Sequence, residues 1–269
     1  MNPIGIMQGR LSLPSNRTRQ VFPMDTWREE FEVAAQLGLN TIEWLVEAET
    51  LQINPLLSAS GRQEIERLAR QTGVRVDSVC AHCVLQWQPY DEGGSARLEP
   101  LAMIISAAGA AGIKHVIIPV LEAATTRKAK SLNAAVALFK EAMAAAENSQ
   151  VNLVFELDRT AEDSLEFVQG FGSASAKICY DSGNATADGR NIVTEIEQLL
   201  PVVAEIHLKD RRVGGGSMPL GQGDTPFTDF FKTLNANHWR GPFVMETPVR
   251  DNPIEQARQN LAFVRKNWI

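Results

Sequence analysis

Short apolar segments alternate with longer amphipathic stretches along the whole chain, and this alternation constrains the fold more than any other feature. Eight segments are predicted as strands: Pro3–Gln8, Asn40–Leu45, Arg75–His82, His115–Val120, Asn152–Glu156, Lys177–Asp181, Glu205–Lys209 and Phe243–Glu246. Helical spacing of apolar residues predicts a helix after each strand. Strands that are separated by helices are expected to run parallel, because a parallel pair needs a crossover connection.

The predicted helices fill the intervals between the strands. They are Asp25–Leu37, Arg62–Gln71, Leu98–Ala111, Lys128–Asn148, Ala161–Gln169, Ile192–Leu200, Phe227–Asn235 and Asn252–Lys266. Gly38, Gly73 and Gly112 each stand between a helix and the next strand, where a helix often ends in the left-handed conformation that glycine adopts without a Cβ clash. This repetition indicates a regular α/β unit.

Eight such units in 269 residues predict an α/β fold of the (β/α)8 TIM barrel type, as a single domain over residues 1–269. A doubly wound open sheet is the main alternative. That fold often carries a glycine-rich nucleotide-binding turn after its first strand, and here the corresponding sequence is QGRLSLPSN. The closed barrel is therefore favoured.

Charge and composition narrow the classes of function. The net charge of −6 disfavours a nucleic-acid partner, because the phosphate backbone is itself negative, but it leaves room for a small phosphorylated substrate. The three cysteines show no disulfide framework and fit a reducing, cytoplasmic environment. The sequence shows neither a secretory signal pattern nor an apolar run of about 18 residues, so no membrane association is expected.

Four side chains that can bind a metal stand at the ends of four consecutive predicted strands. They are Glu156, Asp181, His207 and Glu246. In a TIM barrel the carboxyl ends of the strands form the active site, and alternation along each strand turns these four side chains inward. Three carboxylates and one imidazole suit Mn²⁺ or Mg²⁺ best, and Co²⁺ or Zn²⁺ also fit.

Each of these residues taken alone has an ordinary structural role. Asp181 is placed to cap the following helix, and a single histidine in a strand is commonly part of the core. If all four residues had only structural roles, four metal-binding side chains would stand at equivalent strand ends by coincidence. Burying three carboxylates side by side without a cation would also be costly, so the set predicts one divalent metal ion.

Motifs along nearly the whole chain resemble the xylose-isomerase-like superfamily of sugar and sugar-phosphate isomerases and epimerases. They are IGIMQGRL, FELD, YDSGNA, EIHLKDR, LGQGDTPF and FVMETPVRDNP. The resemblance is nearest to the ketose 3-epimerase branch. It implies that Glu156, Asp181, His207 and Glu246 hold the metal and that Glu156 and Glu246 are the paired acid and base. The implied reaction is proton transfer next to a carbonyl through an enediolate, which the metal stabilises as a Lewis acid.

Other side chains are predicted to contact substrate. His82 ends the third strand, where the resembling family often has a substrate-binding histidine, and Glu43 and Gln8 lie near the ends of the second and first strands. Glu43 is predicted either to bind substrate or to support the site, with a salt bridge in the barrel mouth as the structural alternative. Trp44 is a candidate wall for a sugar ring, with packing as the alternative.

Two further positions come from the resemblance to the epimerases. An arginine often follows the seventh strand, and Arg211 is favoured over Arg212, although the sequence does not fix which of them faces the site. A histidine usually stands three residues after the aspartate ligand, and here that position is Asn184, which is also expected to contact substrate. An amide cannot exchange a proton at neutral pH, so this departure leaves the identity of the sugar open.

Three competing functions use the same fold. A metal-dependent lyase or dehydratase acting on a polyol or a shikimate-like acid would use the same four ligands. A DNA-repair endonuclease of this fold needs more histidines than the four in this chain, and a non-catalytic sugar-binding protein has no need of two carboxylates at a metal. The expected partner is a small sugar or sugar phosphate, and the assembly is left open between a homodimer and a homotetramer.

Overall fold

Eight parallel strands close into a barrel, which confirms the predicted fold. This computed structural model describes residues 2–13, 21–249 and 251–268. The strands are β1 (Ile4–Met7), β2 (Thr41–Leu45), β3 (Arg75–Cys80), β4 (His115–Val120), β5 (Asn152–Leu157), β6 (Ala176–Asp181), β7 (Val203–Leu208) and β10 (Phe243–Met245). Their order around the barrel is β1-β10-β7-β6-β5-β4-β3-β2, and β1 pairs with both β2 and β10.

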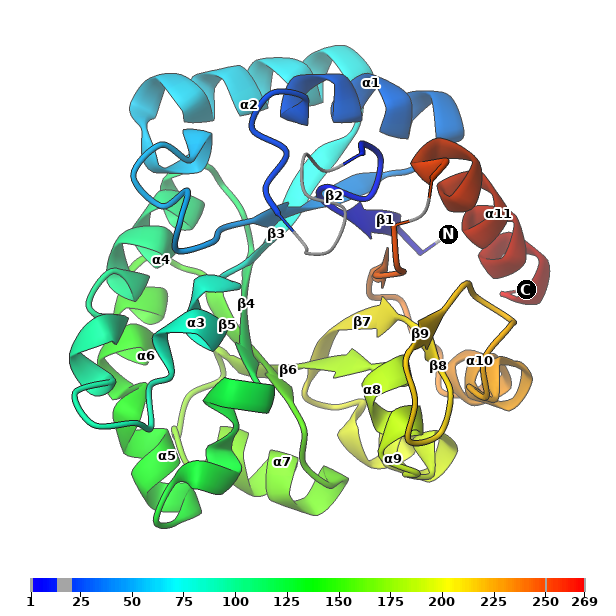
Figure 1. Cartoon of the computed structure of the whole chain (residues 1–269). Coiled ribbons are helices and arrows are strands. Elements are labelled where there is room, and N and C mark those ends of the chain that lie inside the picture. Colours follow the sequence, from blue (N-terminus) through cyan, green and yellow to red (C-terminus); the bar gives the residue numbers. More distant parts are fainter. Residues whose placement is uncertain (1, 14–20, 250, 269) are drawn as a thin grey trace.

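The helices form a ring around the strands (Figure 1). The main ones are α1 (Trp27–Leu37), α2 (Ala59–Thr72), α4 (Leu101–Ala110), α5 (Leu132–Leu138), α6 (Lys140–Asn148), α7 (Ala161–Gln169), α9 (Ile192–Leu199), α10 (Phe227–Ala236) and α11 (Pro253–Asn267). The predicted helix Lys128–Asn148 is thus two helices, α5 and α6, that meet at Phe139. The buried ring of Phe139 packs against Phe155 of β5, with the ring centroids 5.5 Å apart.

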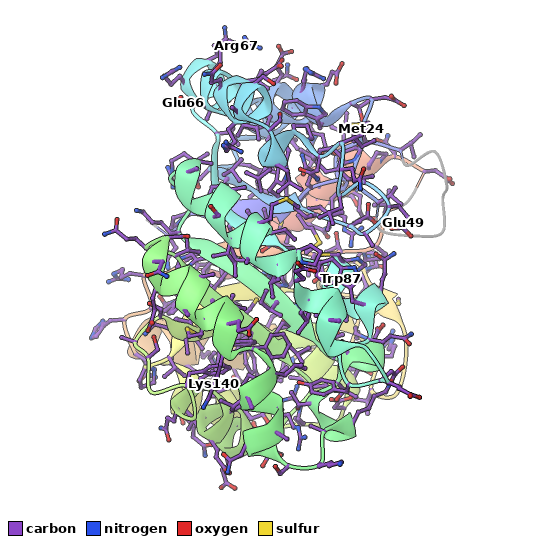
Figure 2. All side chains as sticks on the ribbon, turned by 90° about the vertical axis from the view of Figure 1, so that its left-hand side faces the viewer. Met24, Glu49, Glu66, Arg67, Trp87 and Lys140 are labelled. Carbon is purple, nitrogen blue, oxygen red and sulfur yellow. The ribbon has the colours of Figure 1, made fainter. Side chains whose placement is uncertain are left out.

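The side of the helices that faces the strands is apolar, and the side that faces solvent is charged. The layer between strands and helices is apolar and rich in aromatic rings, including Phe31, Trp44 and Phe167. Charged side chains such as Glu66 and Arg67 of α2 lie on the outer surface (Figure 2). Within the described part of the chain, no helix is both long enough and apolar enough to cross a bilayer.

Additional elements surround the carboxyl ends of the strands. Short helices α3 (Cys83–Trp87) and α8 (Ser182–Ala187) follow β3 and β6. A two-stranded hairpin, β8 (Asp210–Arg211) and β9 (Ser217–Met218), follows β7. The carboxylate of Asp210 accepts hydrogen bonds from the backbone N–H groups of Gly221, Gly223 and Thr225, which ties the hairpin to the loop before α10.

Candidate active site

Four side chains that were predicted as metal ligands converge at the carboxyl ends of neighbouring strands. Glu156 comes from β5, Asp181 from β6, His207 from β7, and Glu246 directly follows β10. One ligand atom from each lies within 4.8 Å of the others, and all four residues are buried. The fold therefore brings together the four residues that the sequence predicted as a set.

Asp181 and His207 each direct one atom toward the other candidate ligands. Asp181 caps α8, because its Oδ1 accepts the N–H of Asn184 at 2.8 Å. Nε2 of His207 lies 3.2 Å from Oε2 of Glu43. The other two atoms of these side chains lie near charged groups: Oδ2 of Asp181 is 3.4 Å from Nζ of Lys209, and Nδ1 of His207 is 3.2 Å from Oε2 of Glu246. One imidazole and three carboxylates that converge in a buried position are ligand types that suit a divalent metal ion.

The two glutamates of the set lie in different electrostatic surroundings. Burial raises the pKa of Glu156 to about 8, with Asp181 and Glu246 adding to the rise while His207 opposes it. Burial also acts on Glu246, but the ammonium of Lys209 and the hydrogen bond from His207 hold the pKa of Glu246 well below its usual range. Nζ of Lys209 lies 2.9 Å from Oε1 of Glu246 and 3.4 Å from Oδ2 of Asp181.

Asn184 connects Glu156 to the hairpin. Its Nδ2 donates to Oε1 of Glu156 at 2.9 Å, and its Oδ1 accepts from Nη1 of Arg211 at 3.0 Å. Arg211 also donates from Nε and Nη2 to the carbonyl oxygen of Gly215. Arg212 pairs with Asp224 at the surface, so of these two arginines Arg211 is the one that lines the pocket.

A pocket of about 610 Å³ opens above the four candidate ligands Glu156, Asp181, His207 and Glu246, called here the metal-binding set. Glu156, Glu246, Asn184, Lys209 and Arg211 line its polar part. Its remaining wall includes the apolar residues Met7, Leu85, Pro119 and Leu121, together with the cationic Arg10. The size and the mixed lining suit a small polyhydroxylated molecule with a carbon chain.

Of the other residues predicted to contact substrate, only His82 is placed to do so. His82 lines the pocket, and its buried Nδ1 has no hydrogen-bond partner among the described residues. Burial lowers the pKa of His82, so the ring is neutral at neutral pH and one nitrogen can accept a hydrogen bond. Glu43 and Gln8 are buried and do not line the pocket: Glu43 contacts His207, and Oε1 of Gln8 accepts the N–H of Leu45.

The prediction for Trp44 is wrong. Trp44 is fully buried on the outer side of β2, where its ring packs against Trp27 with centroids 5.3 Å apart. Its Nε1–H donates to Oδ1 of Asn54. Strand alternation gives the reason, since Trp44 follows the inward-facing Glu43 and must face the helices. It cannot form a wall of the pocket.

Two residues close to the site were not predicted from the sequence. Ser78 of β3 and Glu205 of β7 lie in the barrel interior close to Glu43. Glu205 stands two residues before His207, and strand alternation alone places it on the same inner face. The signal that could have found them is the polarity of these interior positions, which in a TIM barrel are usually branched apolar residues.

Comparison with known proteins identifies the family. The chain matches the family model described as xylose isomerase-like TIM barrel over residues 31–267. This chain belongs to that family. Its relatives include the L-ribulose-5-phosphate 3-epimerase UlaE of Shigella flexneri serotype 5b (strain 8401), which is 24% identical over 237 residues and matched over 82% of each chain.

Solved structures share the same fold at lower identity. D-psicose 3-epimerase from Clostridium cellulolyticum H10, solved with D-tagatose, has a TM-score of 0.74 at 15% identity and is covered over 99% of each chain. The IOLI protein, solved with a zinc atom, has a TM-score of 0.74 at 14% identity, again with 99% of each chain covered. At such identities the structural likeness shows the fold alone.

Proposed function

We propose that this protein is a divalent-metal-dependent epimerase of a ketose or a ketose phosphate. The observation that carries the proposal is the placement of Glu156 and Glu246. Glu156 lies on β5 and Glu246 directly follows β10, the two ends of an arc of four adjacent strands, and His207 and Asp181 lie on the strands between them. Two carboxylates on either side of one cation-binding set, at the base of a pocket, suit inversion at a carbon atom.

The reaction follows from what the two glutamates can do. One carboxylate removes the proton from the carbon next to the substrate carbonyl, and the other glutamate returns a proton to the opposite face. A bound divalent cation would supply Lewis-acid stabilisation of the negative charge that develops on the substrate oxygens. Asn184 orients Glu156, Lys209 orients Glu246, and His82 offers a hydrogen-bond acceptor or donor to a substrate hydroxyl.

The family and the names of its relatives support this choice of substrate class. The curated relative acts on a phosphorylated ketose, and the solved neighbour was crystallised with an unphosphorylated one. Both types of substrate present a carbonyl next to a carbon that carries a hydroxyl. At the pocket, Arg211 donates hydrogen bonds to the carbonyl oxygen of Gly215 and the amide oxygen of Asn184. Among the described residues, Arg211 has no carboxylate partner.

The test is a panel of ketoses and ketose phosphates incubated with the Mn²⁺-loaded enzyme in deuterated water. Epimerisation predicts deuterium at the inverted carbon of the product, followed by NMR. Glu246→Gln and Glu156→Gln should each lower turnover by roughly 10²- to 10⁴-fold. Glu195→Gln is a matched control, because Glu195 is a buried carboxylate on α9 that contacts Tyr180 and Arg190.

Three outcomes would contradict the proposal. Normal turnover by Glu246→Gln would exclude the two-glutamate mechanism. Loss of water from the substrate would identify a lyase, and deuterium on the neighbouring carbon with conversion to an aldose would identify an aldose–ketose isomerase.

A further inference from the structure

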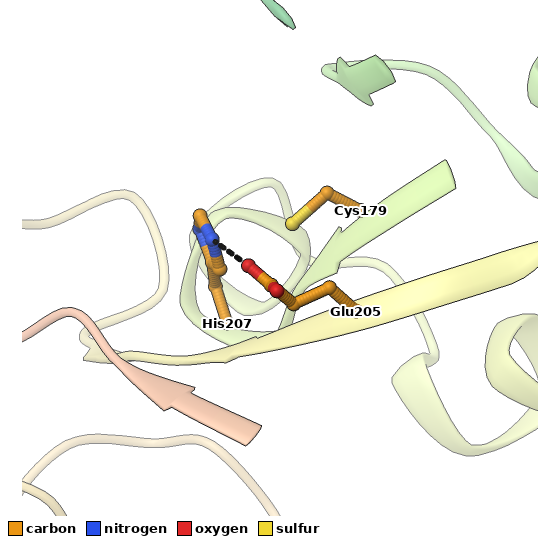
Figure 3. A group of neighbouring side chains, drawn as sticks. All are labelled: Cys179, Glu205 and His207. Atoms are coloured by element: carbon orange, nitrogen blue, oxygen red, sulfur yellow. Dashed lines mark ion pairs between the residues drawn. The ribbon is translucent and has the colours of Figure 1, made fainter. Parts of the chain in front are cut away.

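A layer of polar side chains fills the barrel interior directly beneath the metal-binding set. Glu43 of β2, Ser78 of β3 and Glu205 of β7 are each at most 1% exposed. Figure 3 shows Glu205 beside the ring of His207, with Cys179 of β6 nearby. A barrel interior is normally packed with branched apolar residues, and buried carboxylates are costly unless they are paired. The presence of these polar side chains in the barrel interior therefore needs a specific explanation.

The layer is centred on one nitrogen of His207. Nε2 lies 3.2 Å from Oε2 of Glu43 and 3.5 Å from Oε1 of Glu205. The hydroxyl of Ser78 lies between the two carboxylates, 3.3 Å from Oε2 of Glu43 and 3.2 Å from Oε1 of Glu205. Since β2 and β7 are three strands apart around the barrel, this contact crosses the interior rather than joining neighbouring strands.

The two nitrogens of His207 consequently have different surroundings. Nε2 faces oxygens of Glu43 and Glu205, and an ionised carboxylate at this position accepts a hydrogen bond from Nε2–H. Nδ1 faces the metal-binding carboxylates, 3.2 Å from Oε2 of Glu246 and 3.9 Å from Oε2 of Glu156. A neutral histidine with its hydrogen on Nε2 presents a lone pair at Nδ1, and a lone pair is what a metal ion binds.

We propose that Glu43 is a positioning residue of the metal centre: it accepts the Nε2–H of His207 and so fixes Nδ1 as the metal-binding atom, with Ser78 and Glu205 holding Glu43 in place. This inference rests on the metal centre of the proposed function and assigns it a supporting residue in place of the substrate contact that the sequence predicted for Glu43.

Two alternative explanations predict different results from the proposal. Glu43 could have a purely structural role, or the barrel interior could hold a second cation. A purely structural role would make Glu43 important for stability but not for metal affinity in the folded protein. A second cation held by Cys179, Glu205 and His207, whose ligand atoms also lie within 4.8 Å of one another, would require Nε2 to be free of hydrogen. Metal stoichiometry and the tautomer of His207 therefore distinguish the positioning role from both.

The experiment compares variants of the full chain that have been stripped with chelator and then titrated with Co²⁺. Glu43→Met keeps the approximate volume of the side chain and removes the acceptor. Glu43→Gln keeps one acceptor oxygen, so it is the conservative variant. Glu195→Met is the matched control, because it removes a buried carboxylate on the outer, helical layer. Thermal melts followed by circular dichroism show which variants are folded.

We expect one Co²⁺ per wild-type chain, an affinity roughly 10- to 100-fold weaker in Glu43→Met, and a changed visible spectrum for the bound Co²⁺. Glu43→Gln should recover most of the affinity, and Glu195→Met should match wild type. Equal affinity and an equal spectrum in folded Glu43→Met would overturn the inference and leave the metal centre intact. Absence of Co²⁺ binding by wild type would overturn both.

A second measurement needs no variant and so does not depend on the folding of Glu43→Met. The chain has only four histidines, so ¹⁵N-labelled histidine gives a simple spectrum of the Zn²⁺-loaded protein. We expect His207 to carry its hydrogen on Nε2. A hydrogen on Nδ1, or two bound cations per chain, would overturn the inference.

Discussion

Nζ of Lys209 lies 2.9 Å from Oε1 of Glu246, so a cation of the protein itself is already bound to one of the two proposed acid/base carboxylates. The same ammonium is 3.4 Å from Oδ2 of Asp181. Lys209 thus occupies the border between the metal-binding set and the pocket. An ammonium there attracts Glu246 but repels a divalent metal ion, and these two effects lead to opposite expectations for metal binding and turnover.

Lys209→Met should separate metal affinity from catalysis. Removal of the positive charge should leave the affinity for Mn²⁺ unchanged or increase it, because a repulsive charge is lost. Turnover should fall by up to about 100-fold, because Oε1 of Glu246 loses the donor that orients it. Calorimetric titration with Mn²⁺ measures the metal affinity, and steady-state kinetics measure the turnover. Lys232→Met, at an exposed position on α10, is the control, and a parallel loss of metal affinity would refute the argument.

Asn184 and Arg211 should behave as one unit with Glu156. Asn184→Asp replaces the donor at Oε1 of Glu156 by a carboxylate, and the resulting repulsion should lower kcat more strongly than KM rises. Arg211→Gln should lower kcat as well, because Arg211 fixes which way the Asn184 amide points.

A double-mutant cycle between Asn184 and Arg211 measures this coupling. Residues within one hydrogen-bond network typically show interaction energies of about 0.5–3 kcal/mol, and the double variant should therefore be less impaired than the two single effects added together. Arg212→Gln serves as the control, since Arg212 pairs with Asp224 at the surface. Strict additivity would show that Arg211 does not act through Asn184.

Glu30 should make stability depend on pH. This buried carboxylate accepts the N–H groups of Gly9 and Leu11 and the hydroxyl of Ser12, and burial raises its pKa from 4.5 to about 7. Between these two values the folded state binds more protons at Glu30 than the unfolded state does. The free energy of unfolding contributed by this group must therefore decrease as the pH rises from about 5 to 7.

Comparison with Glu30→Gln isolates that contribution. A shift of this size corresponds to at most roughly 3 kcal/mol. Urea unfolding at several pH values should show that wild type loses stability relative to Glu30→Gln across this window, whatever the offset between the two curves. Parallel curves would mean that Glu30 has an ordinary pKa in the folded protein.

Removal of metal should affect both activity and stability. Dialysis against a chelator leaves three carboxylates close together at the end of the barrel, so the apoprotein should be inactive and should melt at a lower temperature. Mn²⁺ or Co²⁺ should restore both properties. Full activity in protein shown by elemental analysis to be metal-free would rule out the proposed mechanism.

Regular features of the fold and the four candidate ligands were predictable from the sequence. Each strand was visible as a short apolar segment, and the ligands stood at equivalent ends, where alternation along the strand decides the inner face. The same rule applied to Glu43 and Trp44 would have placed Trp44 among the helices, because adjacent residues on a strand face opposite sides.

Contacts between distant parts of the chain were not predictable. His207 and Glu43 are 164 residues apart, and nothing in the local pattern of either strand indicates that they meet across the interior. The hairpin formed by β8 and β9 was missed for a related reason. Its strands have two residues each, and its shape depends on the contacts of Asp210 rather than on any periodic pattern.

Asp210 fixes the base of the hairpin that forms one wall of the pocket. Its carboxylate holds the backbone that follows the hairpin, and Arg211 next to it is held against Gly215 and Asn184. At the tip of the hairpin the backbone N–H of Val213 donates to Oδ2 of Asp224, but the side chain of Val213 is exposed, with 61% of its surface accessible. A change of side chain at Val213 is therefore expected to leave the glutamate pair undisturbed, whereas a change at Gly215 would reach Glu156 through Arg211 and Asn184.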